Sequence, residues 1–307
     1  MGRSEERATT ERNGPAGADG GPFVLVGTDG SPSALRAVEA AAREAGQRGL
    51  RLVVAHAFIW PLFRVDLEPS LYGPTESGLR RQAQIVLDTA VARARAVAPG
   101  TEVSGELISG EPLVVLATRA RGADLVVVGS RGTGAFGAVM LGSVAVHLAA
   151  HAECPVLVVR GREEPEGPVV LAVDGSPDSD AAVDFAFAEA RARGAELVAV
   201  HAWAPSSGPA DLTPLFQSVE EVHAEAGRVL DAALARAAAR HPETKAEPRL
   251  LRGSPREVLL GESEGAQLVV MGARGRGGFA GLLLGSVSQA LLHHARCPVA
   301  VVRNTAG

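Results

Sequence analysis

Residues 125–143, LVVVGSRGTGAFGAVMLGS, and residues 268–286, LVVMGARGRGGFAGLLLGS, decide the fold. Each stretch is an apolar, Val-rich run that ends in Gly-x-x-Gly, followed after nine residues by Gly-Ser. The two copies lie 143 residues apart (272 − 129 = 143 and 285 − 142 = 143). A glycine-rich loop between a strand and a helix N-terminus is a common way of holding phosphate. The sequence therefore predicts two similar domains, each with a phosphate-binding loop.

The regions around both copies alternate between strand and helix patterns. Most strand patterns are uniformly apolar, which predicts a parallel sheet covered on both faces, and so an α/β fold. In the first half we expect strands at 23–28, 50–57, 101–108, 123–129 and 155–160, with helices at 31–49, 79–98, 113–120 and 143–152. The second half repeats this order, and Pro- and Gly-rich segments after Phe58 and after Trp203 predict irregular loops.

The repeat and the composition also predict where the domains end. We expect a disordered extension over 1–21, one domain over 22–161, a short charged linker over 162–166, a second domain over 167–303 and a tail over 304–307. The final strands of the two domains are short and apolar, so their edges need cover.

Composition excludes several classes of function. The net charge is −5, so we expect no general affinity for nucleic acid or anionic lipid. Lys245 is the only lysine of the sequence, which excludes a GxxxxGK phosphate loop. No apolar run reaches membrane-spanning length, and the N-terminus lacks a signal-peptide pattern, so a soluble cytoplasmic protein is expected. Cys154 and Cys297 precede apolar strands and are interpreted as buried small hydrophobic residues.

The repeated loop supplies the first candidate site. Gly129 and Gly132 would let the backbone approach a ligand, since glycine has no Cβ. Ser143 is expected to cap the following helix, whose first amides have no intrahelical partners and suit an anion. The corresponding residues of the second half are Gly272, Gly275, Ser286, Val287 and Ser288.

Two aspartates supply the second candidate. Asp29 and Asp174 each end the first strand of a domain and are followed by Gly-Ser. Ligands of open α/β sheets bind beyond the carboxyl ends of the strands, where a carboxylate can contact ribose hydroxyls or a divalent cation. A helix cap is the competing interpretation, since Asp is common there.

These residues resemble a known family. VGTDGSPSA, VVAHA, VGSRGTGAFGAVMLGSV and CPVLVVR, together with VDGSPDS, VAVHA, MGARGRGGFAGLLLGSV and CPVAVVR, are similar to universal stress protein domains. The resemblance covers residues 22–161 and 167–303 and includes the ATP-binding motif G-x2-G-x9-G-S. It implies two Rossmann-like domains, each a five-stranded parallel sheet of order 3-2-1-4-5 with helices on both faces. It also implies that the halves pair through their last strands as a pseudo-dimer; association of two chains is left open.

The resemblance implies a ligand and its subsites. The ligand would be ATP, one molecule per domain, with Mg²⁺ as a candidate companion ion. Adenine would lie near the backbone of Ala57 and Ala202, while Asp29 and Asp174 would face the ribose. The sugar and phosphate contacts would come from Gly110, Val128, Gly129, Gly132, Gly142, Ser143 and Val144 in the first half, and from Gly253, Met271, Gly272, Gly275, Gly285, Ser286, Val287 and Ser288 in the second.

The first half departs from the family at one position. Relatives often have a hydroxyl two residues after the Gly-Ser serine, which Ser288 supplies and Ala145 does not. Because one neutral hydrogen bond contributes about 1 kcal/mol, we expect several-fold weaker binding in the first half.

Other candidate groups are weaker. Gly132 to Gly137 spell GxGxxG, but the motif does not open a helix directly, so we exclude NAD binding. His147 and His151 have helical spacing but are interpreted as surface residues, and His56 and His201 as structural ones. Arg131 and Arg274 could contact phosphate or solvent, and both interpretations stay open.

Three functions compete. The first is a nucleotide-binding regulator of stress or dormancy that reports ATP occupancy to a protein partner, and that is at most a weak ATPase. The second is an ATP-consuming ligase or nucleotidyltransferase, which would need a His-x-Gly-His or Ser-Gly-Gly-x-Asp motif that the sequence lacks. The third is an interaction scaffold that binds no nucleotide.

Overall fold

The computed structural model describes residues 21–59, 75–132, 141–162, 166–204, 218–276 and 283–304. The predicted extension and most of the two long loops lie outside these residues. The elements of the first half are β1 (Phe23–Gly27), α1 (Pro32–Arg48), β2 (Arg51–Phe58), α2 (Thr75–Val97), β3 (Val103–Ser109), α3 (Pro112–Ala120), β4 (Leu125–Gly129), α4 (Ser143–His151) and β5 (Val156–Val159). Those of the second half are β6 (Val169–Ala172), α5 (Pro177–Arg193), β7 (Leu197–Trp203), α6 (Val219–Arg240), β8 (Ala246–Arg252), α7 (Pro255–Glu262), β9 (Leu268–Gly272), α8 (Ser286–His294) and β10 (Val299–Val302).

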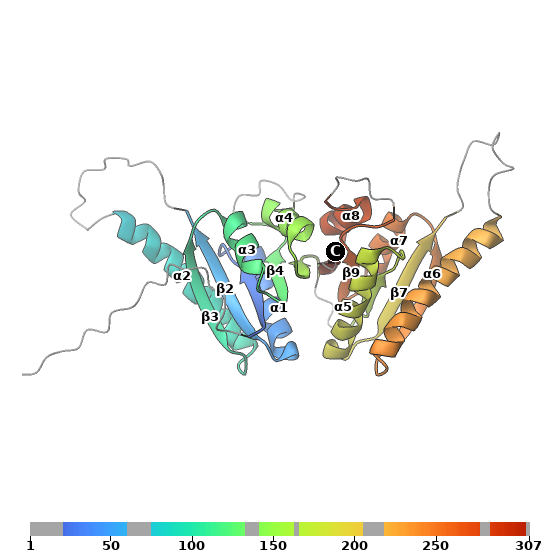
Figure 1. Cartoon of the computed structure of the whole chain (residues 1–307). Coiled ribbons are helices and arrows are strands. Elements are labelled where there is room, and N and C mark those ends of the chain that lie inside the picture. The colour runs from blue at the N-terminus through green and yellow to red at the C-terminus, as the bar shows by residue number, and fades with distance from the viewer. Residues whose placement is uncertain are drawn as a thin grey trace, which may run out of the picture.

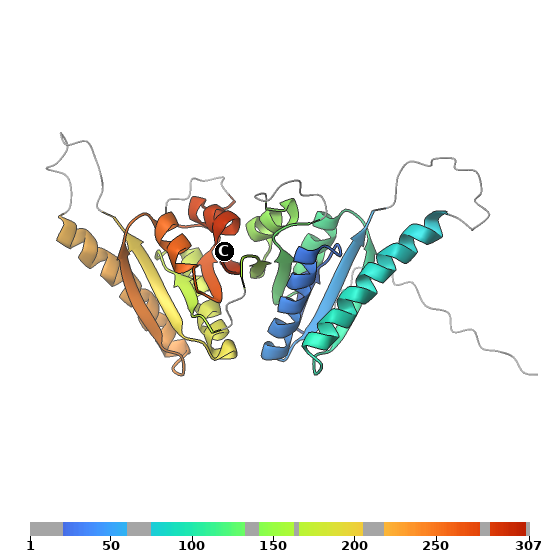
Figure 2. The same cartoon turned by 180° about the vertical axis from the view of Figure 1, so that it is seen from behind.

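The ten strands form one sheet, in the order β3-β2-β1-β4-β5-β10-β9-β6-β7-β8. Each half is parallel and has the predicted order 3-2-1-4-5, so the α/β Rossmann-like fold is confirmed. The two halves stand side by side, with α2 and α6 toward the outside and α4 and α8 beside the junction (Figures 1 and 2).

Helices cover both faces of the sheet because successive strand residues point to opposite sides. Val24 and Val26 belong to the core under α1 and α2, whereas Leu25 belongs to the core on the opposite face, with Leu116 of α3. All four of these β1 and α3 side chains are buried, which explains the uniformly apolar strand pattern. Cys154 and Cys297 are buried in the same core as Leu25 and Leu116, as predicted.

Local sequence signals set the helix ends. Ser31 and Ser176 accept hydrogen bonds from backbone amides of the first turns of α1 and α5, and both helices end at glycines with positive φ, Gly49 and Gly194. This is the expected combination of a serine N-cap, an early proline and a left-handed glycine at the C-terminus.

The two halves join through an antiparallel strand pair at the centre of the sheet. β5 pairs with β10, with Val158 opposite Val299 and Val156 opposite Val301. The prediction that the final strands pair with each other is therefore confirmed. Arg160, just after β5, crosses the junction and donates hydrogen bonds to the carbonyl oxygens of Leu291, Leu292 and His293 at 2.7, 2.8 and 2.8 Å.

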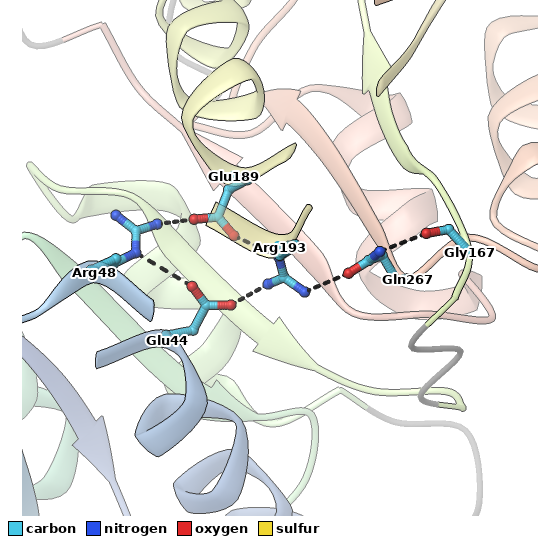
Figure 3. A network of polar contacts seen from close by, with 6 residues as sticks. All are labelled: Glu44, Arg48, Gly167, Glu189, Arg193 and Gln267. Carbon is cyan, nitrogen blue, oxygen red and sulfur yellow. Dashed lines mark hydrogen bonds and ion pairs between the residues drawn. The ribbon is translucent and has the colours of Figure 1, made fainter. Parts of the chain in front are cut away.

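A ring of four charged side chains links α1 of the first half to α5 of the second half (Figure 3). Glu44 and Glu189 each contact both Arg48 and Arg193. The pairs are equivalent in the repeat, since 189 − 44 = 145 and 193 − 48 = 145. Glu44 and Glu189 are 3% and 1% exposed, so the ring is an internal contact between the halves. We call it the charged ring.

Candidate nucleotide site

The candidate site lies at the carboxyl ends of β1 and β4 in the first half, and of β6 and β9 in the second. These neighbouring strands pair in parallel, and the chain leaves them toward opposite faces, so a crevice forms between the connections. Asp29 and Asp174 follow the first strand of each pair, and Gly129 and Gly272 end the second. The topology thus brings together the two candidate groups of each half.

In the second half this crevice is a pocket of about 520 Å³. Such a volume lies within the usual range of small-molecule sites. Every residue predicted for the second half except Gly253 lines it: Asp174, Ala202, Met271, Gly272, Gly275, Gly285, Ser286, Val287 and Ser288. The lining also includes Ser179, Leu259, Leu284, Arg274 and Arg276. The motifs and the family resemblance together predicted the first group, whereas Ser179 and Leu259 carry no signal in the sequence.

Asp174 connects two loops on opposite sides of the pocket. Its Oδ1 accepts a hydrogen bond from the Ser176 amide at 2.9 Å, and its Oδ2 accepts one from the Arg276 amide at 3.1 Å. The serine caps α5, so the aspartate acts beside the cap and not as the cap itself. The carboxylate is therefore held in a fixed orientation in the lining of the pocket.

The two glycines of Gly-x-x-Gly are needed by contacts within the protein. A Cβ at Gly272 would lie 2.8 Å from the Asp178 backbone, and one at Gly129 would lie 2.8 Å from the Ser33 carbonyl oxygen. A Cβ at Gly132 would lie 2.7 Å from Asp29 Oδ2. These glycines let helices α1 and α5, and the aspartates, pack against the loops, and their expected role in ligand approach stays a prediction.

The third glycine of each motif is different. A Cβ at Gly285 would have its nearest neighbour at 3.6 Å, and one at Gly142 at 3.7 Å, which are ordinary contact distances. Their φ values, −69° and −65°, suit any residue. Nothing in the described protein requires glycine at these two positions.

These glycines are also the N-caps of α8 and α4, which corrects the expectation that Ser143 is the cap. Neither helix has a side chain capping its first turn, whereas α1, α5 and α6 are capped by Ser31, Ser176 and Ser218. The first-turn amides of α8, at Ser286, Val287 and Ser288, therefore remain available on the pocket side. Together with the helix dipole they form a site suited to an anion.

The Ser288 hydroxyl already has a hydrogen-bond partner within the protein. It is 4% exposed and donates a hydrogen bond to the Gly272 carbonyl oxygen at 3.0 Å. Its proton would have to leave that carbonyl to reach a phosphate oxygen. The advantage expected of Ser288 over Ala145 is therefore smaller than the sequence suggested, because one hydrogen bond would be exchanged for another.

Two histidines fix the strand ends next to the predicted adenine positions. His56 Nδ1 lies 2.7 Å from the Thr28 carbonyl oxygen, and His201 Nδ1 lies 2.6 Å from that of Val173. A carbonyl only accepts hydrogen bonds, so Nδ1 carries the proton in both. These are the structural histidines predicted, and Ala57 and Ala202 follow them directly in β2 and β7.

Gly110 and Gly253 lie one strand further out, where their amides donate to the carbonyl oxygens of Phe58 and Trp203 at 2.9 and 2.8 Å. Their φ values of 149° and 154° explain why glycine occupies both positions.

The other predicted residues of the first half lie at positions equivalent to the pocket lining of the second half: Val128, Gly129, Gly132, Gly142, Ser143 and Val144.

Other candidates do not form a site. His147 and His151 stack with ring centroids 4.0 Å apart, and burial, followed by His151, lowers the pKa of His147. Burial raises the pKa of Cys154 to about 11 and that of Cys297 to about 12, so both thiols are unreactive. Within the described ranges there is no cluster of three potential metal ligands. None of the helices described there is long and apolar enough to cross a membrane. Three aromatic residues of the loop sequences, Phe136, Phe279 and Trp60, lie outside the described residues.

Comparison with known proteins identifies the family. The model of the universal stress protein family matches residues 23–160 and residues 167–303. The chain belongs to the universal stress protein family. It contains two such domains in tandem, and membership of this family supports a role in the response to stress.

Relatives and solved structures agree with this assignment. A universal stress protein of Mycolicibacterium smegmatis is 38% identical over 293 residues, covering 91% of this chain and 96% of the relative. One from Mycobacterium tuberculosis is 35% identical over 305 residues, covering 91% and 94%. The crystal structure of a universal stress protein from Archaeoglobus fulgidus has a TM-score of 0.67 at 21% identity, covering 92% of this chain and 98% of that one, which supports the fold.

Proposed function

We propose that this universal stress protein binds adenine nucleotide, with one ATP in each half, and that occupancy of the sites regulates its contacts with a protein partner. Asp29 and Asp174 face the ribose, the strand ends at Ala57 and Ala202 receive the adenine, and the first turns of α4 and α8 hold the phosphates. The two binding domains are residues 22–161 and 167–303.

The N-cap glycine of α8 is the observation that supports the proposal most. Serine would cap this helix better than glycine and would fit sterically, because a Cβ at Gly285 has its nearest neighbour at 3.6 Å. Glycine at this position leaves the amides uncovered and lets an outside group approach them closely. The same holds for Gly142 in the first half, where the distance is 3.7 Å.

Magnesium has a secondary place in this proposal. Each Asp174 oxygen already accepts a backbone amide, at 2.9 and 3.1 Å, so part of the capacity of the carboxylate is used within the protein. An Mg²⁺ ion arriving with ATP would be held chiefly by phosphate oxygens and water, as this ion prefers. We expect ATP to bind without Mg²⁺, with an affinity that the ion modulates.

The first test is mass spectrometry of the purified, denatured protein for adenine nucleotide, followed by calorimetric titration with ATP, with and without Mg²⁺. Copurified nucleotide or saturable heat at millimolar ATP is expected. Absence of both would reject nucleotide binding and favour the scaffold interpretation.

A sharper test uses one double variant in which stability and ATP affinity should change in opposite directions. Gly142→Ser combined with Gly285→Ser should raise the melting temperature slightly, because each hydroxyl caps a helix, while ATP affinity falls. A loss of affinity in a protein that is at least as stable cannot come from unfolding. Unchanged affinity in this variant would contradict the placement of the phosphates at these two helices.

A further inference from the structure

The two halves differ at the end of the pocket where α8 begins. In the second half, Arg274 lies between the motif glycines and Arg276 follows them, and both line the pocket. The equivalent residues of the first half are Arg131 and Thr133. A second arginine makes the second loop more basic than the first.

A larger difference lies beneath this loop. Asp178, in the first turn of α5, occupies the position of Ser33 in α1 (178 − 33 = 145, as for Asp174 and Asp29). Asp178 is 4% exposed, and its carboxylate accepts hydrogen bonds from the Arg274 amide at 3.1 Å, the Arg274 Nε at 3.3 Å and the Asn304 amide at 3.1 Å. The Ser33 hydroxyl accepts only the Arg131 amide, at 3.3 Å, among the contacts described for it.

Arg274 is next to the helix end that would hold phosphate. The Arg274 Cα lies 3.6 Å from the position of a Cβ at Gly285, and the Gly285 amide donates to the Ala273 carbonyl at 2.9 Å. Its ion pair with Asp178 uses Nε, which leaves the Nη groups of the guanidinium as donors for a further oxygen. The side chain is 48% exposed, and Arg274 is one of the residues that line the pocket.

We propose that Asp178 positions Arg274 as a phosphate-recognising residue, which makes the candidate site of the second half discriminate ATP from AMP more strongly than that of the first half. The inference depends on the proposed nucleotide binding and adds a specificity to it. An arginine that is already held in place loses little side-chain entropy when it meets a phosphate. In the first half the uncharged, shorter side chain of Ser33 stands at the position of this aspartate.

Removing the charge of Asp178 tests the proposal through the direction in which ATP affinity changes relative to AMP affinity. If the carboxylate acted only through its charge, its removal would increase the affinity for the more anionic ligand. If it acts by holding Arg274, its removal should decrease ATP affinity relative to AMP. The two explanations therefore predict opposite changes in one ratio.

The experiment uses the full chain with Gly142→Glu, which is designed to block the candidate site of the first half at a position where a Cβ has room. ATP, ADP and AMP are titrated calorimetrically into this parent, into Asp178→Ser and into Arg274→Gln. We expect each substitution to lower the ratio of ATP to AMP affinity by about tenfold, equivalent to about 1.4 kcal/mol. The double variant should lose no more than either single one, because both act on the same contact.

The controls separate the possible failures. Ser33→Asp is made in a chain whose second-half site is blocked by Gly285→Glu. It should raise the ratio of ATP to AMP affinity at the candidate site of the first half. A parent that binds no nucleotide would reject the proposed function, and this inference with it. A parent that binds ATP while Asp178→Ser and Arg274→Gln keep or raise the ratio would overturn the inference alone. If Asp178→Ser does not fold, Arg274→Gln, at a half-exposed side chain, carries the test.

Discussion

At the scale of single residues, different physical requirements explain why glycine occupies each position of the repeated motif. Gly272 and Gly275 make room for atoms of the protein, namely the Asp178 backbone and the Asp174 carboxylate. Gly285 makes room for nothing within the described protein, and its φ of −69° demands no glycine. Substitutions at these positions should therefore differ in their effect on stability.

We predict that Gly275→Ala destabilises the protein by about 1–3 kcal/mol, because the new Cβ would overlap the Asp174 Oδ2. Gly285→Ala serves as the matched control in the same loop and should cost much less. Urea unfolding in the absence of nucleotide measures both. Equal losses for the two variants would show that the glycines do not differ as described.

Many residues of the candidate site could be predicted from the sequence. The side-chain contacts of Asp178 and Ser288 could not. The spacing of Gly, Ser and Asp predicted many pocket residues, because positions with special backbone requirements carry these residue types and can be recognised in the sequence. The role of Asp178 cannot be recognised in this way: it occupies a first helical turn, where an acidic residue normally is explained by the helix dipole. The Ser288 hydroxyl was expected at the phosphates because sequence does not reveal that a carbonyl competes for its proton.

At the scale of elements, α1 and α5 interact through charge as well as through apolar packing. The charged ring encloses two carboxylates and two guanidinium groups between the helices (Figure 3). Arg193 also donates to Gln267 Oε1 at 3.2 Å, which extends the ring toward β9. The equivalent Glu-x-x-x-Arg pairs, at 44 and 48 and at 189 and 193, are visible in the sequence but resemble solvated helix faces.

Removing one arginine of the ring should be costly. Arg193→Met would leave two buried carboxylates with Arg48 alone, and such broken pairs typically cost about 3–5 kcal/mol. Arg191→Met on the same helix is the control, since its contact with Glu243 is exposed and should contribute little. Thermal and urea unfolding compare them. A similar small effect of both substitutions would mean that the ring does not stabilise the fold.

The ring should also make stability depend on pH. Burial, and then the Glu189 carboxylate, raise the pKa of Glu44 from 4.5 to about 7 despite the two arginines. The folded state therefore favours protonated Glu44, so its contribution is complete below pH 4.5 and is lost as the pH rises through 7. The difference amounts to at most about 3 kcal/mol.

Glu44→Gln removes this titration. We predict that the free energy of unfolding of the natural protein falls more between pH 5 and pH 8, as a window around these pKa values, than that of the variant. Urea unfolding at intervals of pH measures the difference between the two profiles. Parallel profiles would show that Glu44 titrates as it does in the unfolded chain.

At the scale of the whole molecule, one sheet runs through both halves. The pairing of β5 with β10, the charged ring and the contacts of Arg160 with the end of α8 all cross the junction. The order of the strands was predictable, because the repeat and the family resemblance together define it. The contacts of the charged ring and Arg160 were not, since they join residues far apart in sequence through side chains of ordinary type.

We predict that the two halves unfold together. Differential scanning calorimetry should show one transition, with equal calorimetric and van't Hoff enthalpies, because the junction is buried and hydrogen-bonded. Two separate transitions would indicate that each half is stable alone and that the junction adds little.

The central antiparallel strand pair has a consequence for how this protein behaves on dilution. Two separate polypeptides joined in this way would dissociate at low copy number, because their association depends on concentration. Here a short peptide segment tethers the partners, and their effective local concentration stays high however few molecules a cell contains. The paired β5 and β10 edges are therefore covered even at trace levels, when a protein built from two free subunits would expose them.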